Sequence, residues 1–198
     1  MSIASKKGLL AAAGPDTLIV ASTESIREQF SKDSATGDSD VVSYEAQLKI
    51  PVQMRVSQVS FSADEAYLVI SAQQGGGLAV YDVGALMQGN TSPAFELSTE
   101  GAVLRALIPN PTPEKAEFFA VLTADGKLLM ANLKEQRFLS GPSGSVLKSG
   151  VSCLSWSSRG KQLVAGLEDG TASQMTPEGE MKAVIPMPPA LEPNQHGE

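Results

Sequence analysis

The segments VSFS at residues 59–62, ALIP at residues 106–109 and LSWS at residues 154–157 decide the fold of this chain. They recur at intervals of 47 and 48 residues. Each is followed by a turn, a second β-rich run, a glycine turn and a third run; the second runs read YLVI, FFAV and QLVA. Short strands that recur with a period of about 40–50 residues are typical of the blades of a β-propeller.

The content of each repeat supports this interpretation. Val59 and Phe61 alternate with serines, which places two apolar side chains on one face of a pleated strand. Asp125-Gly126 and Asp169-Gly170 occupy equivalent places and are dipeptides that close tight hairpins. Tyr81-Asp82 lies where many propellers carry a Trp-Asp pair.

Blades of about 40–45 residues and rings of about 4–8 blades together define the predicted fold class. We expect an all-β fold: a partial WD-type β-propeller with about three and a half four-stranded antiparallel blades, in a ring that this chain does not close. The predicted propeller covers residues 1–192. Its parts are a half-blade at 8–30, a polar inserted loop at 31–47, blades at 48–98, 99–146 and 147–186, and a Pro-rich disordered tail at 187–198.

An unclosed ring leaves apolar blade faces in contact with water. We therefore expect that the chain either self-associates through these faces or is unstable, and the sequence leaves open whether it is a fragment of a longer product or a genuine half-propeller.

Composition and charge exclude several classes of function. A content of 42% hydrophobic and 19% charged residues indicates a globular chain. The net charge of −7 and the scattering of the 15 Lys and Arg residues argue against direct nucleic-acid binding. No segment approaches the ~18 apolar residues of a membrane span, so we expect no membrane insertion. Lys6 and Lys7 precede a short apolar run that Gly14-Pro15 interrupts, which favours a hairpin over a signal peptide.

The sequence offers no catalytic, cofactor-binding or metal-binding constellation. The single histidine, His196, lies in the polar tail, and the glycines of residues 75–77 lack the Lys-Ser/Thr of a phosphate-binding loop. Asp64, Asp125 and Asp169 fall in turns, where aspartate makes local hydrogen bonds. We expect a non-enzymatic protein without a cofactor.

Four further residues are assigned to the core. Phe61, Ile108 and Trp156 share one position of the repeat, which predicts a bulky position between blades. Cys153, the only cysteine, excludes an intrachain disulfide and indicates a reducing compartment. We expect its thiol to be buried in a strand.

A family resemblance adds to this interpretation. It rests on SCLSWSSRGKQLVAG at residues 152–166, DGT at 169–171, TPEGE at 176–180, IPMPP at 185–189 and VSQVSFSADE at 56–65. In this order, the segments resemble the N-terminal propeller of the cytoplasmic-side nucleoporins, the fungal nucleoporin-159 class and its animal counterpart, nucleoporin-214. The similarity spans most of residues 8–192.

The resemblance implies a non-enzymatic docking module of the nuclear pore complex, at the cytoplasmic face of the nuclear envelope. Its expected partners are a DEAD-box RNA helicase that functions in mRNA export and other nucleoporins. No helicase-contact residue maps onto a matched position, so the partner-binding residues are left open. The alternatives are a WD-type scaffold subunit of an unrelated complex, since one fold serves many functions, and a propeller hydrolase, which would need catalytic groups in a central channel.

Overall fold

The computed structural model describes residues 1–14, 17–36, 48–52, 55–73, 75–141 and 144–189; the side chains of residues 32–36 are not included. Sixteen strands in this part of the chain form four antiparallel sheets of four strands each. The first sheet contains β1 (Ser2–Ala4), β2 (Leu9–Ala13), β3 (Thr17–Ser22) and β4 (Leu48–Pro51). The second contains β5 (Val56–Phe61), β6 (Tyr67–Ala72), β7 (Leu78–Asp82) and β8 (Phe95–Leu97).

The third and fourth sheets repeat this order. The third contains β9 (Leu104–Pro109), β10 (Phe118–Thr123), β11 (Leu128–Asn132) and β12 (Arg137–Phe138). The fourth contains β13 (Val151–Trp156), β14 (Leu163–Leu167), β15 (Ala172–Met175) and β16 (Met181–Ile185).

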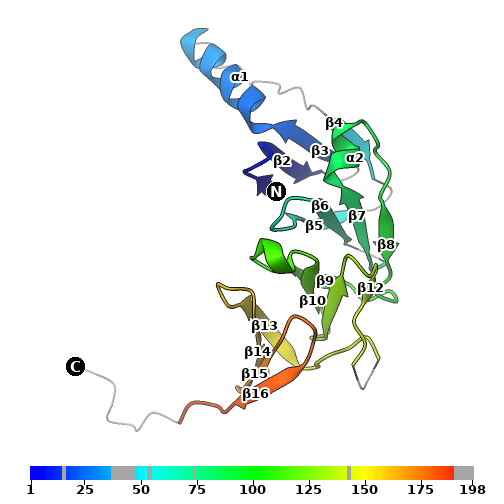
Figure 1. Cartoon of the computed structure of the whole chain (residues 1–198), viewed down its shortest axis with the longest axis vertical. Helices are drawn as coiled ribbons and strands as arrows, with labels where there is room; N and C mark the ends of the chain where they lie inside the picture. Colours follow the sequence, from blue (N-terminus) through cyan, green and yellow to red (C-terminus); the bar gives the residue numbers. More distant parts are fainter. Residues whose placement is uncertain (15–16, 37–47, 53–54, 74, 142–143, 190–198) are drawn as a thin grey trace, which may run out of the picture.

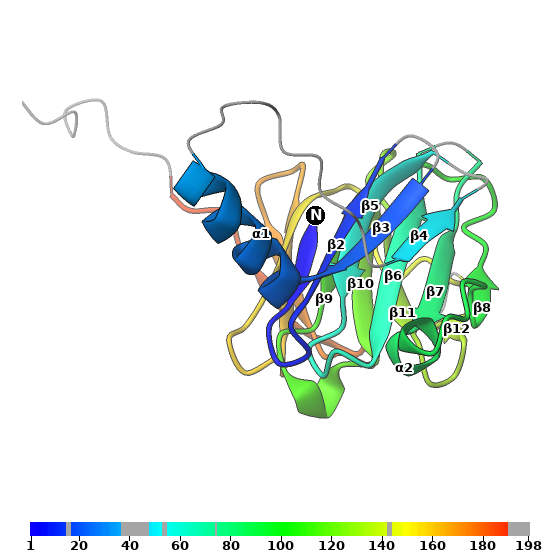
Figure 2. The same ribbon diagram turned by 90° about the horizontal axis from the view of Figure 1, so that it is seen from above.

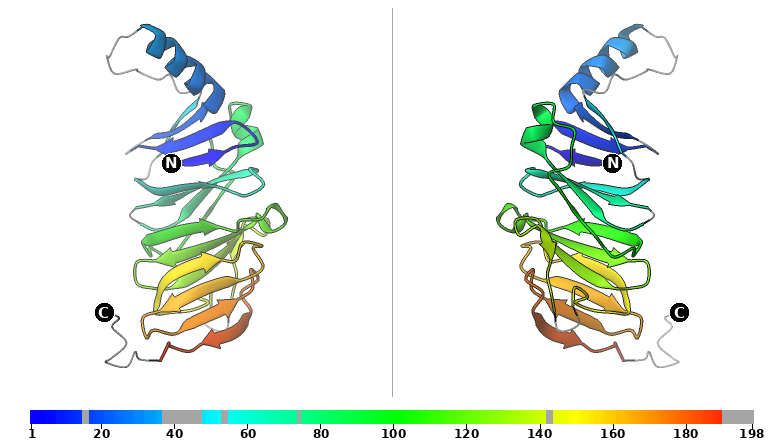
Figure 3. Two further views of the ribbon diagram at one scale, coloured as in Figure 1. Left: turned by 90° about the vertical axis from the view of Figure 1, so that its left-hand side faces the viewer. Right: turned by 90° about the vertical axis from the view of Figure 1, so that its right-hand side faces the viewer.

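The four sheets stack face to face in sequence order (Figure 3). The stack is curved: β1, β5, β9 and β13 follow its concave side, and β4, β8, β12 and β16 its convex side (Figure 1). The first and last sheets do not meet, so the all-β, partial propeller with an unclosed ring that the sequence predicted is confirmed.

The structure differs from the sequence prediction in the first blade. A half-blade was expected at residues 8–30, but the first sheet is complete. Its innermost strand is β1, and its outermost strand, β4, belongs here rather than to the blade predicted at 48–98. Leu48 and Ile50 explain this pairing, because both pack into the apolar cluster between the first and second sheets.

The polar loop predicted at 31–47 begins as a helix. The helix α1 (Thr23–Thr36) lies between β3 and β4 and projects away from the sheets (Figure 2). The Oγ of Ser22 accepts a hydrogen bond from the Ser25 N–H at 3.4 Å, as an N-cap does. The first turns contain Glu, Arg and Gln and no Gly or Pro, a composition that favours helix. The rest of the predicted loop, residues 37–47, lies outside the described residues.

Two shorter helical segments occupy other connections. The helix α2 (Val83–Met87) joins β7 to β8, and its N-cap Asp82 accepts a hydrogen bond from the Ala85 N–H at 2.7 Å. The 3-10 helix η1 (Pro113–Lys115) lies between β9 and β10. The predicted disordered tail lies mostly outside the described residues.

Each junction between neighbouring sheets encloses its own apolar cluster. Alternate side chains of β6 show the principle: Leu68 and Ile70 pack toward the first sheet, whereas Val69 packs toward the third. Phe119 is fully buried at the second junction and Leu163 at the third. Burying an apolar side chain of this size contributes about 1.5–3 kcal/mol, so these faces supply most of the driving force for folding.

The predicted core position lies at these junctions. Phe61 is buried at the first junction, and Ile108 and Trp156 are partly buried at the third. The Nε1–H of Trp156 also donates a hydrogen bond to the Ile108 carbonyl at 3.2 Å, so this indole links β13 to β9. The prediction that these residues pack between blades is confirmed, but the prediction that they share one repeat position is wrong for Ile108. Phe61 and Trp156 face the preceding sheet, whereas Ile108 faces the following one, and the register places Pro109 at the position of Phe61 and Trp156.

Hydrogen bonds between inner strands connect the other two junctions. The Ser2 Oγ accepts a hydrogen bond from the Phe61 N–H at 3.1 Å. The Gln58 side chain spans the second junction: its Nε2 donates to the Arg105 carbonyl and its Oε1 accepts from the Leu107 N–H, both at 2.6 Å. A side-chain amide thus bonds to β9 as a neighbouring strand would.

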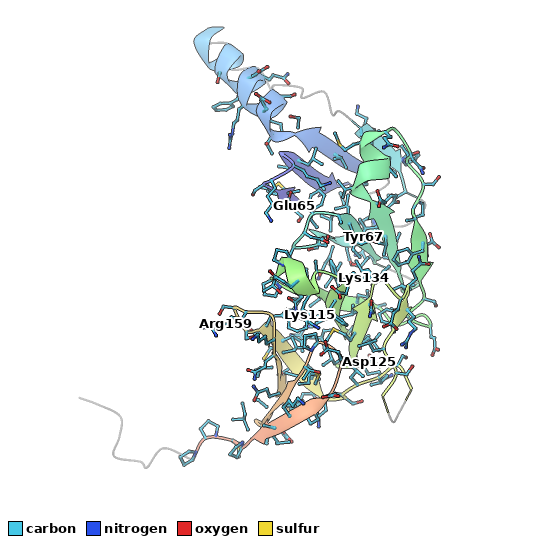
Figure 4. All side chains as sticks on the ribbon, in the orientation of Figure 1. Glu65, Tyr67, Lys115, Asp125, Lys134 and Arg159 are labelled. Atoms are coloured by element: carbon cyan, nitrogen blue, oxygen red, sulfur yellow. The ribbon has the colours of Figure 1, made fainter. Side chains whose placement is uncertain are left out.

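The turns between the first two strands of neighbouring sheets are also joined by hydrogen bonds from buried polar side chains. Buried Glu65, labelled in Figure 4, accepts hydrogen bonds from the Lys6 and Lys7 N–H groups at 2.9 and 2.8 Å. Asn110 is fully buried, and its Nδ2 donates to the Gly160 carbonyl at 2.8 Å. Because each of these polar groups is buried and paired, removing one partner would leave the other unsatisfied.

Substitution of Gly160 directly tests the contribution of the hydrogen bond between Asn110 and Gly160. It has φ +62°, and a Cβ there would overlap Asn110 Oδ1. Gly160→Ala combines left-handed backbone strain of about 1–2 kcal/mol with disruption of a buried hydrogen bond worth about 1–3 kcal/mol. We expect urea unfolding to show a loss of stability equal to both contributions.

Gly89→Ala is the matched control, because Gly89 has φ +90° and a Cβ there would meet nothing within 4 Å. It should show the backbone contribution alone. Equal losses in the two variants would contradict a contribution from the hydrogen bond between Asn110 and Gly160.

Candidate interaction surface

The carboxylates that could have suggested acid–base chemistry form local turn contacts. Asp64 Oδ1 accepts hydrogen bonds from the Ser62 Oγ–H at 2.6 Å and the Ala66 N–H at 3.1 Å. Asp169 Oδ1 accepts from the Thr171 N–H and hydroxyl at 2.9 and 2.6 Å. Their assignment to turns is confirmed.

Two of the turn aspartates have a lowered pKa. For Asp125, hydrogen bonding by Lys127 and then by Thr123 lowers the pKa below its usual range. The Lys127 Nζ lies 2.7 Å from the Asp125 Oδ2. For Asp169, the hydrogen bonds from Thr171 lower the pKa. Both side chains thus serve as hydrogen-bond acceptors in turns that reverse the chain.

Cys153 is exposed, and the prediction of a buried thiol is wrong. The residue lies on β13 opposite Gly166, on the face of the fourth sheet that no other sheet of the described residues covers. Its neighbours Leu154 and Trp156 pack against the third sheet instead. The alternation of the strand therefore directs the thiol outward.

The described residues contain no group of three or more His, Cys, Asp or Glu side chains arranged to hold a metal. His196, the only histidine, lies outside them. None of the helices in the described part is long and apolar enough to cross a membrane.

An open groove lies between the outer parts of the first and second sheets, with a volume of about 300 Å³. The end of β4 and the residue after it form one wall, and the loop between α2 and β8 forms another. Its lining comprises Pro51, Val52, Ala79, Tyr81, Thr91, Ser92, Pro93 and Glu96. We call this space the outer groove; it combines apolar walls with one carboxylate and one phenol.

A smaller, more apolar pocket of about 170 Å³ adjoins α2. Val20 and Leu48 of the first sheet and Leu86 and Met87 of α2 line it, and Met87 is 50% exposed. Both spaces depend on how α2 and its following loop sit against the first sheet. Tyr81 was noted in the sequence as part of a repeat motif, but Glu96 carries no pattern that would identify it.

The architecture defines a class of protein. Four consecutive four-stranded antiparallel sheets, stacked about a concave axis with β1, β5, β9 and β13 innermost, are blades of a β-propeller.

Comparison with known proteins then identifies the family. Residues 1–198 match the model of the NUP159/214 beta propeller, and the chain belongs to this family. It is 56% identical over 191 residues to nucleoporin NUP159 of Chaetomium thermophilum, covering 96% of this chain and 13% of that protein. Over 193 residues it is 30% identical to nucleoporin nup146 of Schizosaccharomyces pombe, covering 94% and 14%. With the human nuclear pore complex protein Nup214 it shares 27% identity over 203 residues, covering 97% and 9%.

Solved structures show the same fold. The N-terminal domain of Nup159 superposes with a TM-score of 0.65 at 18% identity, over 94% of this chain and 44% of that one. Nup159 in a Saccharomyces cerevisiae complex with dbp5, gle1, ip6 and adp gives a TM-score of 0.64 at 17% identity, over 94% and 43%. The propeller of Cps50 (Swd1) from Myceliophteria thermophila gives 0.61 at 16% identity, over 90% and 51%.

The lowered pKa values of Asp125 and Asp169 predict an acid-dependent loss of stability. Each group ionises more readily in the folded chain than its ordinary pKa of 3.8, so its contribution is present above that pH and is lost as pH falls through the folded value. We expect the melting temperature to fall below about pH 4, and to fall less steeply in a D125N/D169N variant. Glu114→Gln, in the exposed η1, is the control. Identical slopes in the parent and the double variant would contradict this role.

Proposed function

We propose that this propeller is a protein-docking module at the cytoplasmic face of the nuclear pore complex and that it functions in mRNA export by binding a DEAD-box helicase. The observation that carries the proposal is 56% identity with a Nup159 nucleoporin over 96% of this chain. A Nup159 has been solved in a complex with dbp5, which provides the precedent for a helicase partner. Docking requires no catalytic group in the propeller, in keeping with an arrangement of carboxylates that serves turns.

A direct binding measurement tests the helicase proposal. The helicase dbp5 is titrated onto the immobilised chain, with the Nup159 N-terminal domain as positive control and the Cps50 (Swd1) propeller as negative control. We expect saturable binding to the chain and to the Nup159 domain but not to the Cps50 propeller. Binding to the Nup159 domain without binding to this chain would overturn the proposal. Equal binding to the Cps50 propeller would favour a generic WD-type scaffold instead.

We also propose that the 198-residue polypeptide associates with a second copy of itself. The outward face of the first sheet carries Ile3, which is 54% exposed, and Leu10. The outward face of the fourth sheet carries Ile185, which is 45% exposed, and Ala172. Within the chain, every covered face meets the next sheet in the same head-to-tail direction. By the same direction of stacking, the outward face of the fourth sheet in one copy would meet the outward face of the first sheet in the next.

A closed pair of copies would contain eight sheets, since each copy has four, and eight lies within the range of about 4–8 blades in known rings. Sedimentation equilibrium should show a dimer at micromolar concentration, and Ile3→Ser combined with Ile185→Ser should shift it to monomer. Met87→Ser, which changes an exposed apolar residue away from both faces, should leave the dimer intact. A parent chain that sediments as a monomer at all concentrations would refute self-association.

A further inference from the structure

The outer groove holds two polar groups that the chain itself does not pair. Tyr81 is only 4% exposed as a whole residue, and its hydroxyl, which has no hydrogen-bond partner among the described residues, is not enclosed but opens onto the groove. Glu96 is exposed, and no cation of the described part forms an ion pair with it. The largely buried Tyr81 side chain therefore presents an unpaired donor and acceptor to a ligand that enters the groove, beside the unpaired carboxylate of Glu96.

The strand register brings these two groups together. Glu96 of β8 lies opposite Ala79 of β7, and Tyr81 follows Ala79 by two residues, so all three share one face of the second sheet. Ala79 and Tyr81 belong to the cluster that packs toward the first sheet. Both polar groups therefore face the space between the two sheets.

The local electrostatics further favour the neutral form of the phenol. Burial and then the Glu96 carboxylate raise the pKa of Tyr81 above its ordinary value of 10.0. The phenol is therefore neutral at physiological pH, and it can donate one hydrogen bond and accept others. The Glu96 carboxylate only accepts, so the groove presents a negative charge beside an acceptor hydroxyl.

The chemistry of the lining selects the class of ligand. An anion would be repelled by Glu96, and a purely apolar group would bury the carboxylate and the phenol without partners. A cation with several N–H donors satisfies both. The apolar lining at Pro51, Val52 and Pro93 suits an alkyl stem whose charged end meets the exposed Glu96.

We propose that the outer groove binds an arginine side chain presented by an extended segment of a partner protein. The guanidinium donates to the Glu96 carboxylate and to the Tyr81 hydroxyl, and the methylene stem packs between the two prolines. Arginine is favoured over lysine because its planar fork of five donors engages two acceptors at once. The charge complementarity extends to the whole chain, whose net charge is −7.

This site is independent of the helicase proposal, because it concerns a side chain and not the identity of the protein that carries it. It also lies on the convex side, between two sheets that are both complete in this chain. The groove therefore does not depend on how the ring is closed.

A peptide titration followed by NMR tests the site. The probe is Ac-Gly-Pro-Arg-Pro-Gly-NH₂, and its partner peptide carries citrulline, which keeps the shape but removes the charge. We expect the arginine peptide to shift the backbone signals of Glu96, Ala79 and Thr91 in a saturable way. The citrulline peptide should bind about tenfold more weakly, the ratio expected for the loss of hydrogen bonds to a charged group.

Two conservative variants separate recognition from folding. Glu96→Gln removes only the charge and should weaken binding about tenfold, and Tyr81→Phe removes only the hydroxyl and should weaken it roughly fivefold. Glu168→Gln, at a carboxylate outside the groove, should have no effect. The proposal is overturned if the arginine peptide causes no shifts in the parent chain, or if the citrulline peptide binds as tightly as the arginine peptide. It is also overturned if the Glu96→Gln variant keeps the NMR spectrum of the folded parent and binds the arginine peptide as tightly as the Glu168→Gln variant.

Discussion

A four-stranded sheet has two faces, and the structure of this protein depends on covering each face with the neighbouring sheet. No sheet of the described residues encloses a core by itself: Val69 and Ile70, adjacent in β6, are fully buried in two different clusters. Stability in such a stack comes from each sheet and its contacts with the next, as in repeat proteins. Apolar packing alone does not fix how one sheet is positioned on the next. The hydrogen bonds made by the side chains of Gln58, Glu65 and Asn110 do so, because each joins two neighbouring sheets at a defined point.

Most of the architecture was predictable because its signals are local. The alternation in β5 and the Asp-Gly turns reflect interactions within about fifteen residues, and a single sequence also displays the recurrence of such segments at intervals of 47 and 48 residues. The same local signals carried the family resemblance, since the matched segments are strands and turns of the second and fourth sheets. Phe61 and Trp156 were correctly assigned to junctions, because a large apolar side chain that alternates with serine on a strand is buried by packing against a neighbouring sheet. Ile108 was matched to them one residue out of register, since it faces the opposite side of its sheet.

The features that the sequence did not disclose depend on distant partners. The helix α1 separates β3 from β4, so the last strand of the first sheet was assigned to the wrong blade. Cys153 resembles its buried neighbours in sequence, and only the absence of a covering sheet among the described residues makes it exposed. The outer groove brings Pro51 of one sheet beside Tyr81 and Glu96 of another. The spacing of these residues along the chain does not reveal that they lie close together in the fold.

The Gln58 bridge has a consequence for how the junctions can be observed. The Leu107 amide hydrogen is held by a side chain of the preceding sheet, through a contact between residues 49 positions apart. Its exchange with solvent deuterium therefore reports the loss of an inter-blade contact and not the fraying of β9. One amide thus measures the free energy of releasing the Gln58 side chain, which sets a lower bound on the free energy of opening that junction. This is possible because the hydrogen bond joins a backbone amide of one blade to a side chain of another.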